Sequence, residues 1–313
     1  MFIGVTCGHE HWGQRAFRLV EELGFDGLFC GEHLMMHRPV WDGITMTTAM
    51  ACATERIAVG PAAIIAPLRH PSVLAKELAG ADNISGGRVI ATLGVGGDNP
   101  RELAAAGVPN ERLGCRTDEA IDILRRYWSG ARFSWDSELY PLEDVWLDPL
   151  PARPGGPPLW VAGRKPPSVK RAALRGDGFL PYMLTAEAAG RAYAEIRELA
   201  TAAGRRLDLE SDYAFGAYVY VSYGPDRAAA ARRGDEHLAW RYNQPRYRTD
   251  LAGKYVVAGD AEACVEQILA FHEAGCTHLV MHLVREEHEP VEPELEALAG
   301  AVLDRVRSAT ARA

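Results

Sequence analysis

Short apolar runs alternate with amphipathic segments along most of the chain. The runs predicted to be strands fall at residues 2–6, 27–30, 57–65, 89–93, 159–162, 178–180, 213–222 and 277–283. Between them, apolar residues recur at helical spacing, as in 14–23, which Gly24 follows in the position that ends many helices. The pattern predicts eight strands paired in parallel, because parallel neighbours are joined by helical crossovers.

The economical α/β fold for eight such units is a single (β/α)8 barrel, or TIM barrel, over residues 1–313. A doubly wound parallel sheet is the alternative, although no GxGxxG motif follows the first strand. Two stretches interrupt the alternation. Residues 130–158 are rich in Pro, aromatic and acidic residues, and residues 232–256 contain several Arg and Tyr residues. We expect both to be irregular insertions in one barrel domain.

Composition narrows the class of protein. Apolar residues make up 48% of the chain, and the net charge is −8, with no basic stripe of the kind that binds nucleic acid. The first residues lack the features of a signal peptide, and no apolar run approaches the roughly 20 residues that span a bilayer. Six scattered cysteines without a CxxC pair indicate reduced thiols. We therefore expect a cytoplasmic enzyme with a small-molecule substrate and with neither nucleic acid nor a membrane as its partner.

Candidate catalytic residues follow the predicted strands, because a barrel carries its active site at the carboxyl ends of its strands. His33 directly follows the second strand and lies beside Glu32, and His9 lies in the loop after the first strand. A histidine at such a position can exchange a proton with a bound ring or substrate near neutral pH. Trp12 and Trp41 lie in the same two loops and predict an aromatic wall for the substrate.

The spacing of two histidine pairs leaves a zinc hydrolase open as an alternative. His9 and His11 are two positions apart, and His33 and His37 are four positions apart, which are spacings that zinc ligands use. No cysteine cluster or Asp-x-His sequence completes a ligand set around them. We therefore predict that the protein holds no metal.

Two glycine-containing segments suit a cofactor that carries a phosphate. Gly94, Gly96 and Gly97 follow the fourth strand, where backbone without side chains lets a flat ring or a phosphate approach. Gly163 and Arg164 follow the fifth strand and lead into the next predicted helix. The amino end of that helix and the neighbouring cations can face one phosphate. Neither segment is specific alone, because glycines after strands often form only tight turns.

Together these segments resemble the bacterial-luciferase-like family of flavin- and deazaflavin-dependent oxidoreductases. The resemblance runs from the first strand to about residue 285. It rests on the order and spacing of the motifs GFDGLFCGEHL (24–34), TERIAVGPAAIIAPLRHPSVLAKELAGADNISGGRVIATLGVGG (54–97), RTDEAIDILRRYW (116–128), GGPPLWVAGR (155–164), RGDGFLP (175–181) and VAGDAEACVEQILAFHEAGCTHLVM (257–281).

The resemblance implies a flavin-type ring that lies across the carboxyl ends of the barrel strands. It also implies a bulge with a non-prolyl cis peptide near Ala62, Ala63 and Ile64, against the back of the ring. His33 matches the family's active-site histidine, and Arg164 matches the segment that receives the cofactor phosphate.

Two chemistries are open within this family. The run from TERIAVG to GVGG is most similar to the deazaflavin branch, which favours coenzyme F420 and hydride transfer. FMN with insertion of oxygen from O2 is the alternative, since both branches accept the Glu-His pair and the glycine turn. A barrel that has lost catalysis is the alternative of another class. The resemblance also implies a homodimer, because members of the family usually pair through helices beside the early strands.

Overall fold

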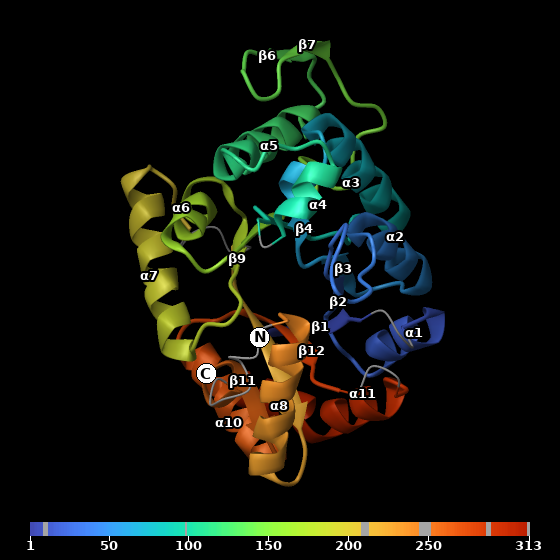
Figure 1. Cartoon of the computed structure of the whole chain (residues 1–313), viewed down its shortest axis with the longest axis vertical. Helices are drawn as coiled ribbons and strands as arrows, with labels where there is room; N and C mark the ends of the chain where they lie inside the picture. The colour runs from blue at the N-terminus through green and yellow to red at the C-terminus, as the bar shows by residue number, and fades with distance from the viewer. Residues whose placement is uncertain (9–11, 98, 208–212, 244–251, 286–288, 312–313) are drawn as a thin grey trace.

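The computed structural model describes residues 1–8, 12–97, 99–207, 213–243, 252–285 and 289–311. Parallel strands form an inner wall, and helices surround it (Figure 1). The strands of this wall are β1 (Phe2–Cys7), β2 (Gly27–Cys30), β3 (Ala58–Pro61), β4 (Ile64–Ile65), β5 (Ala91–Gly94), β8 (Leu159–Ala162), β9 (Gly178–Leu180), β10 (Ala214–Tyr223) and β12 (His278–Leu283).

The strands are neighbours in the order β3-β2-β1-β12-β10-β9-β8-β5-β4. The pairs along this path are parallel, as the alternation of strands and helices predicts. β1 therefore lies between β2 and the last strand, β12, with Phe2 level with His278 and Gly4 level with Gly27. A further strand, β11 (Val256–Gly259), pairs with the carboxyl-terminal part of β10 outside this path.

β3 and β4 act as one barrel strand with a bulge between them, because β3 pairs with β2 whereas β4 pairs with β5. The Ala62–Ala63 peptide in the bulge is cis, as the resemblance implies. On the other side of β3, Val59 N donates to Arg88 O at 3.1 Å and Ile90 N donates to Val59 O at 3.0 Å. These bonds close the sheet on itself, which confirms the (β/α)8 barrel and excludes the open, doubly wound sheet.

Most helices lie where the sequence pattern predicts them. They are α1 (Gln14–Glu22), α2 (Gly43–Ala53), α3 (Pro71–Ser85), α5 (Leu113–Trp128), α6 (Pro166–Arg175), α7 (Ala186–Ala202), α10 (Ala261–Glu273), α11 (Glu292–Leu298) and α12 (Asp304–Thr310). A π-helical turn joins the last two of these helices. Three short elements lie outside the predicted ranges, namely η1 (Ala66–Leu68), α4 (Pro100–Ala105) and α9 (Ala252–Tyr255).

The two predicted insertions differ in the structure. Within 130–158, β6 (Phe133–Trp135) and β7 (Leu142–Val145) form an antiparallel hairpin that stands away from the barrel at the top of Figure 1. The prediction that 232–256 is irregular is wrong for its first ten residues, because α8 (Arg227–Arg241) runs through them. Asp226 caps this helix, and the four alanines that follow Arg227 favour it strongly.

Aromatic side chains fill the barrel interior near the amino ends of the strands. The ring centroids of Phe2, Phe29 and Trp160 lie 6.1 to 6.5 Å apart. The His278 ring lies 4.9 Å from Phe2 and 5.2 Å from Trp160. Because these rings occupy that half of the interior, a ligand has to bind at the other end, where the strands have their carboxyl ends. We call that end the mouth of the barrel.

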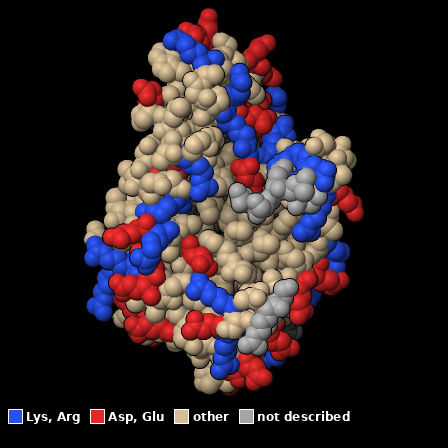
Figure 2. Space-filling model, turned by 180° about the vertical axis from the view of Figure 1, so that it is seen from behind, with Lys and Arg blue, Asp and Glu red and all other residues tan. Residues whose placement is uncertain are grey.

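Three further observations concern the helices, the cysteines and the surface charge. No helix among the described residues is both long and apolar enough to cross a membrane. The six cysteines are all free thiols, and four of them are buried. Figure 2 shows basic and acidic side chains spread together over one face of the molecule, with mostly uncharged surface beside its central hollow.

Candidate active site

His33 follows β2 at the mouth of the barrel, and its side chain is 24% exposed. Its Nδ1 lies 3.2 and 3.3 Å from the two carboxylate oxygens of Glu102, a buried residue of α4. The same carboxylate accepts the backbone N–H groups of Leu34 and Met35, the latter at 3.2 Å. Because an ionised carboxylate can only accept, this geometry assigns the ring proton to Nδ1 and leaves Nε2 of His33 for a ligand.

Glu102 is a functional residue that the sequence analysis missed. Asn99 and Pro100 do carry the signal for a helix start, since Asn favours the N-cap and Pro the first helical position. The structure confirms that Asn99 caps α4, and Asn99 Nδ2 also donates to Met35 O at 2.9 Å. These bonds dock α4 on the loop after β2, which brings Glu102 to His33 across 69 positions of sequence.

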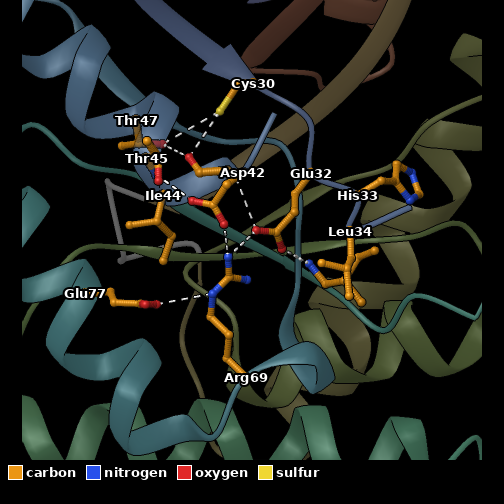
Figure 3. A network of polar contacts seen from close by, with 12 residues as sticks. Cys30, Glu32, His33, Leu34, Asp42, Ile44, Thr45, Thr47, Arg69 and Glu77 are labelled. Atoms are coloured by element: carbon orange, nitrogen blue, oxygen red, sulfur yellow. Dashed lines mark hydrogen bonds and ion pairs between the residues drawn. The ribbon is translucent and has the colours of Figure 1, made fainter. Parts of the chain in front are cut away.

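Glu32 precedes His33 in the chain, but the two side chains point in different directions (Figure 3). The Glu32 side chain is 3% exposed, and its Oε1 accepts from Gly43 N at 3.2 Å while its Oε2 accepts from Ile65 N at 3.0 Å. Arg69 Nη2 lies 2.7 Å from the same Oε1. The prediction of a catalytic Glu32 is therefore corrected: both oxygens hold structural partners that join α2 and the bulged strand to the loop of His33.

Arg69 lies at the centre of this ion network, between three carboxylates (Figure 3). Besides Glu32 it pairs with Asp42, and its Nε lies 3.3 Å from Glu77 Oε2. Burial disfavours the charged guanidinium, but the hydrogen bond and the charge of Glu32 outweigh burial and raise the pKa of Arg69. The positive charge of Arg69 is thus fully countered within the protein.

Small side chains and bare backbone meet at the bulge between β3 and β4 and at the ends of β5 and β8. A Cβ on Gly94 would lie 3.7 Å from the Cβ of Ala63 and 3.8 Å from that of Ala162, and all three residues are half-buried. We call these three residues the cradle. Gly96 follows it with a φ of +65°, and a Cβ there would lie 2.5 Å from Ile65 Cγ2. Such a surface lets a flat ring lie against the backbone.

The other residues predicted to touch the ring lie close to the cradle. Ala62 packs against the aromatic interior of the barrel. A Cβ on Gly97 would lie 3.5 Å from Leu113 Cδ1, at the start of α5. The side chain of Ile64 is fully buried in the core, so only its backbone is left for a ligand.

Gly163 and Arg164 lie beside the cradle, directly after β8. Gly163 has a φ of +137°, and a Cβ there would lie 2.7 Å from Ser168 Oγ, so only glycine fits. Arg164 is exposed, and its guanidinium lies 5.2 Å from the ring centroid of Tyr182, the distance of a cation–π contact. The Arg164 guanidinium can therefore bind an anion while it keeps its contact with the Tyr182 ring.

The prediction that a helix amino end holds the phosphate here is corrected. α6 begins with Pro166 and Pro167, which have no N–H to donate. The next two amide groups, of Ser168 and Val169, both donate to Lys165 O, at 2.9 and 3.3 Å. The first turn of α6, from Pro166 to Val169, therefore offers no free N–H group to an anion.

Trp12 and Trp41, the two residues predicted to line the substrate pocket, differ in burial. Trp12 is 7% exposed, and its ring is stacked 6.4 Å from Phe17, so it packs in the core rather than in a substrate wall. Trp41 is 49% exposed, in the loop between β2 and α2. His9 lies outside the described residues. Within the described ranges, no three His, Cys, Asp or Glu side chains are grouped so that they could hold a metal ion.

The wall of the mouth opposite the cradle is polar, and it is built from β1, β10, β12 and α8. Thr6 Oγ1 lies 2.8 Å from His282 Nδ1, and His282 Nε2 lies 3.1 Å from His237 Nε2. Arg241 joins them, with Nη1 3.3 Å from His282 Nε2 and Nη2 3.4 Å from the hydroxyl of Tyr218.

Comparison with known proteins places the chain among flavin-type oxidoreductases. The family model described as luciferase-like monooxygenase matches residues 13–278. The F420-dependent glucose-6-phosphate dehydrogenase of Beutenbergia cavernae is 31% identical over 322 aligned positions, which cover 93% of this chain and 91% of that protein.

Solved structures agree on the fold. An F420-dependent secondary alcohol dehydrogenase in complex with an F420-acetone adduct matches with a TM-score of 0.82 and 19% identity, over 98% of this chain and 99% of that one. The type II Baeyer-Villiger monooxygenase of Pseudomonas putida in complex with FMN matches with a TM-score of 0.77 and 20% identity, over the same shares. Both cofactor types thus occur on this barrel.

Proposed function

The chain belongs to the family of luciferase-like monooxygenases, and on this basis we propose that it is an oxidoreductase that binds coenzyme F420 and transfers a hydride to or from a small organic substrate. The observation that carries the proposal is the pair of His33 and buried Glu102 at the same mouth as the cradle. The name of the relative from Beutenbergia cavernae supports F420 over FMN.

The residues at the mouth fit a flat ring with an anionic tail. The cradle of Ala63, Gly94 and Ala162 offers backbone and methyl groups, with no large side chain to displace. Arg164 is exposed beside it and offers a charge for the cofactor phosphate. Bound F420 would supply a ring carbon that takes up or releases a hydride, and the protein would supply position and proton transfer.

His33 is the proposed general acid–base, and Glu102 is the residue that positions it. With its Nδ1–H held by Glu102, the imidazole presents Nε2 to the substrate and accepts a proton from a hydroxyl as the hydride leaves the adjoining carbon. The carboxylate keeps the imidazole ring oriented while Nε2 takes up the proton. In the reverse direction the same nitrogen returns the proton to a carbonyl oxygen.

Glucose 6-phosphate is the first substrate to test, because it appears in the names of similar proteins. FMN-dependent oxygen insertion is the second candidate function, and the fold shared with the FMN-containing monooxygenase supports keeping it. A protein without catalysis is the third.

A homodimer in the cytoplasm completes the proposal. α2 contains no charged residue, and it exposes Thr45, Ala49 and Cys52. α3 packs beside it and exposes Val73 and Ile84, which are 51% and 55% exposed. Exposed apolar side chains on two adjacent helices suit contact with a second copy of the chain. Light scattering after gel filtration should give twice the chain mass, and the chain mass alone would contradict the dimer.

The deciding experiment is a fluorescence titration of the purified protein with F420 and, separately, with FMN. Micromolar or tighter binding of F420 alone, followed by its reduction with glucose 6-phosphate or another alcohol, is the expected result. Preference for FMN, with oxygen uptake, would favour the monooxygenase instead. Binding of neither would contradict the proposed function.

A further inference from the structure

Arg241 differs from the other arginines of the interior in what it contacts. Arg69 and Arg171 each pair with carboxylates, and Arg88 donates to four backbone carbonyl groups. Arg241 is half-buried, and its guanidinium contacts the imidazole of His282 and the hydroxyl of Tyr218 and lies 5.7 Å from the ring centroid of Tyr220. Within the described part of the chain, no carboxylate forms an ion pair with it.

The histidines beside Arg241 are neutral. A guanidinium can only donate, so His282 Nε2 accepts, and the proton of this ring sits on Nδ1, which donates to Thr6 Oγ1. His237 Nε2 then donates to the same acceptor. Burial and the charge of Arg241 hold the pKa of His282 well below its usual range, and the same causes lower the pKa of His237 to about 3. The cluster therefore carries the charge of Arg241 without a counter-charge.

The cluster faces the same space as the cradle. Tyr218 packs against the interior group that also contains Ala62, so both line the inside of the barrel. Around the closed sheet, β12 lies across from β5, which carries Gly94 of the cradle. A ligand that extends from a ring on the cradle across the mouth would end at Arg241.

We propose that Arg241 is the subsite for an oxyanion of the substrate, a carboxylate or a phosphate ester, held across the mouth from the cofactor ring. The guanidinium fork matches either group, and the contacts of Nη1 with His282 and of Nη2 with Tyr218 do not use all of its five N–H donors. A cation with no carboxylate partner among the described residues attracts an anion more strongly in a half-buried setting than at an exposed position. The inference deepens the proposed function and rests on it only for the nature of the ligand on the cradle.

The same chemistry could come from the acidic groups of the cofactor, so the test is done with and without it. Thermal unfolding is recorded with sodium phosphate or sodium acetate in place of chloride at constant ionic strength, for the F420-saturated protein and for the protein alone. The variants are Arg241→Gln, Arg241→Lys and the control Arg197→Gln. Arg197 also lacks a carboxylate partner among the described residues, but it stacks on Phe215 on the outside of the barrel.

We expect phosphate or acetate to raise the Tm of the F420-saturated wild type and of Arg197→Gln. Arg241→Gln should bind the anion about 10- to 100-fold more weakly, the loss of one charged hydrogen bond, and Arg241→Lys should fall between them. The anion with the larger effect identifies carboxylate or phosphate. F420 affinity should not change in Arg241→Gln; a matching loss of F420 affinity would assign Arg241 to the cofactor and overturn the proposal.

A measurement on the wild type covers the case in which Arg241→Gln does not fold. Phenylglyoxal modifies accessible arginines, and peptide mass spectrometry reports the rate at each one. Saturating phosphate should slow modification of Arg241 and leave Arg197 unchanged. Equal rates at Arg241 with and without phosphate, or an equal rise in Tm for all variants, would overturn the oxyanion subsite. Absence of F420 binding alone would contradict only the proposed function, because the anion titration of the protein alone still stands.

Discussion

Arg69 and Arg241 are two guanidinium groups on different sides of the barrel mouth, and they have opposite surroundings. Arg69 meets three carboxylates, among them the nearly inaccessible Glu32. Arg241 meets a hydroxyl and a neutral imidazole. A cation that is paired with carboxylates inside the protein holds loops in place. A cation with neutral partners can still attract the negative charge of a ligand. The presence or absence of a counter-charge therefore distinguishes a structural arginine from a ligand-binding arginine more clearly than residue type or burial does.

The neighbours Glu32 and His33 differ in the same way, because Glu32 has structural partners and His33 faces the ligand site. Substitution of His33 should give the largest effect on activity. His33→Ala should lower kcat/KM by about 10²- to 10⁴-fold, because the proton acceptor at Nε2 is lost. The free energy of unfolding and the affinity for F420 should stay close to those of the wild type. Steady-state kinetics with F420 and the identified substrate measures the effect, and activity near that of the wild type would remove His33 from the mechanism.

Glu102→Gln is the matched variant for His33, because it keeps the shape of the positioning residue and removes its charge. Its loss of activity should be smaller than that of His33→Ala. The KM for the substrate should stay near that of the wild type while kcat falls, because Glu102 orients His33 and is not placed against the substrate. A purely structural role for Glu102 would change stability and leave kcat near that of the wild type.

Glu32→Gln should act on stability instead of chemistry. It removes the charge of the buried carboxylate that pairs with Arg69, so the free energy of unfolding should fall by about 3–5 kcal/mol. Urea denaturation followed by circular dichroism measures this. Glu138→Gln is the control, because the ion pair of Glu138 with Arg112 is exposed and its loss should have no measurable effect. Equal stabilities of the two variants would contradict the scaffold role of Glu32.

Arg164 tests whether the exposed cation beside the cradle serves the cofactor. Arg164→Ala should weaken F420 binding by about 1.5–3 kcal/mol through the loss of a charged hydrogen bond to the phosphate. Lys165→Ala, at the next position, should have a smaller effect, because Lys165 lacks the aromatic support that Tyr182 gives Arg164. Unchanged affinity in Arg164→Ala would place the phosphate elsewhere.

The neutral histidines beside Arg241 predict a dependence of stability on pH. The folded-state pKa of His237 is lowered to about 3 by burial and by Arg241, so the unfolded chain binds more protons below the ordinary histidine pKa. Stability is therefore full above about pH 6.5 and falls as the pH decreases towards 3. His237→Gln should lose about 1–2 kcal/mol less than the wild type between pH 7 and pH 5. Identical pH slopes in urea denaturation would contradict a buried neutral His237.

Arg241→Gln should change stability only slightly, and so it sharpens the contrast with Glu32→Gln. Removing a half-buried cation that has no carboxylate partner relieves its desolvation cost, and this offsets the lost contacts. We expect the free energy of unfolding at pH 7 to stay within about 1 kcal/mol of the wild type. A loss as large as that of Glu32→Gln would make Arg241 part of the scaffold.

The repeating parts of the fold could be predicted from the sequence, and so could the position of His33. Strand runs such as 159–162 and 178–180 match the structure at both ends, because period and length are local properties. His33 could be placed because it directly follows a strand, and strand ends define the mouth.

Partnerships across the chain could not be predicted in this way. Glu32 and Glu102 are both acidic residues near predicted loops. The sequence around them does not show that Glu32 pairs with Arg69 whereas Glu102 contacts His33. The same limit applies to Arg241, whose partners could not be predicted because its helix was assigned to an irregular stretch. Which charges are countered is decided by tertiary contacts alone.

The pairing of β1 with β12 affects the order in which the protein can be completed during synthesis. β1 leaves the ribosome first among the strands, but one of its two neighbours, residues 278–283, is made more than 250 residues later. Until then, both β1 and β10 present open edges, which are the surfaces on which strands of different chains join. Chains that stop before β12 should therefore aggregate rather than accumulate as a smaller folded protein.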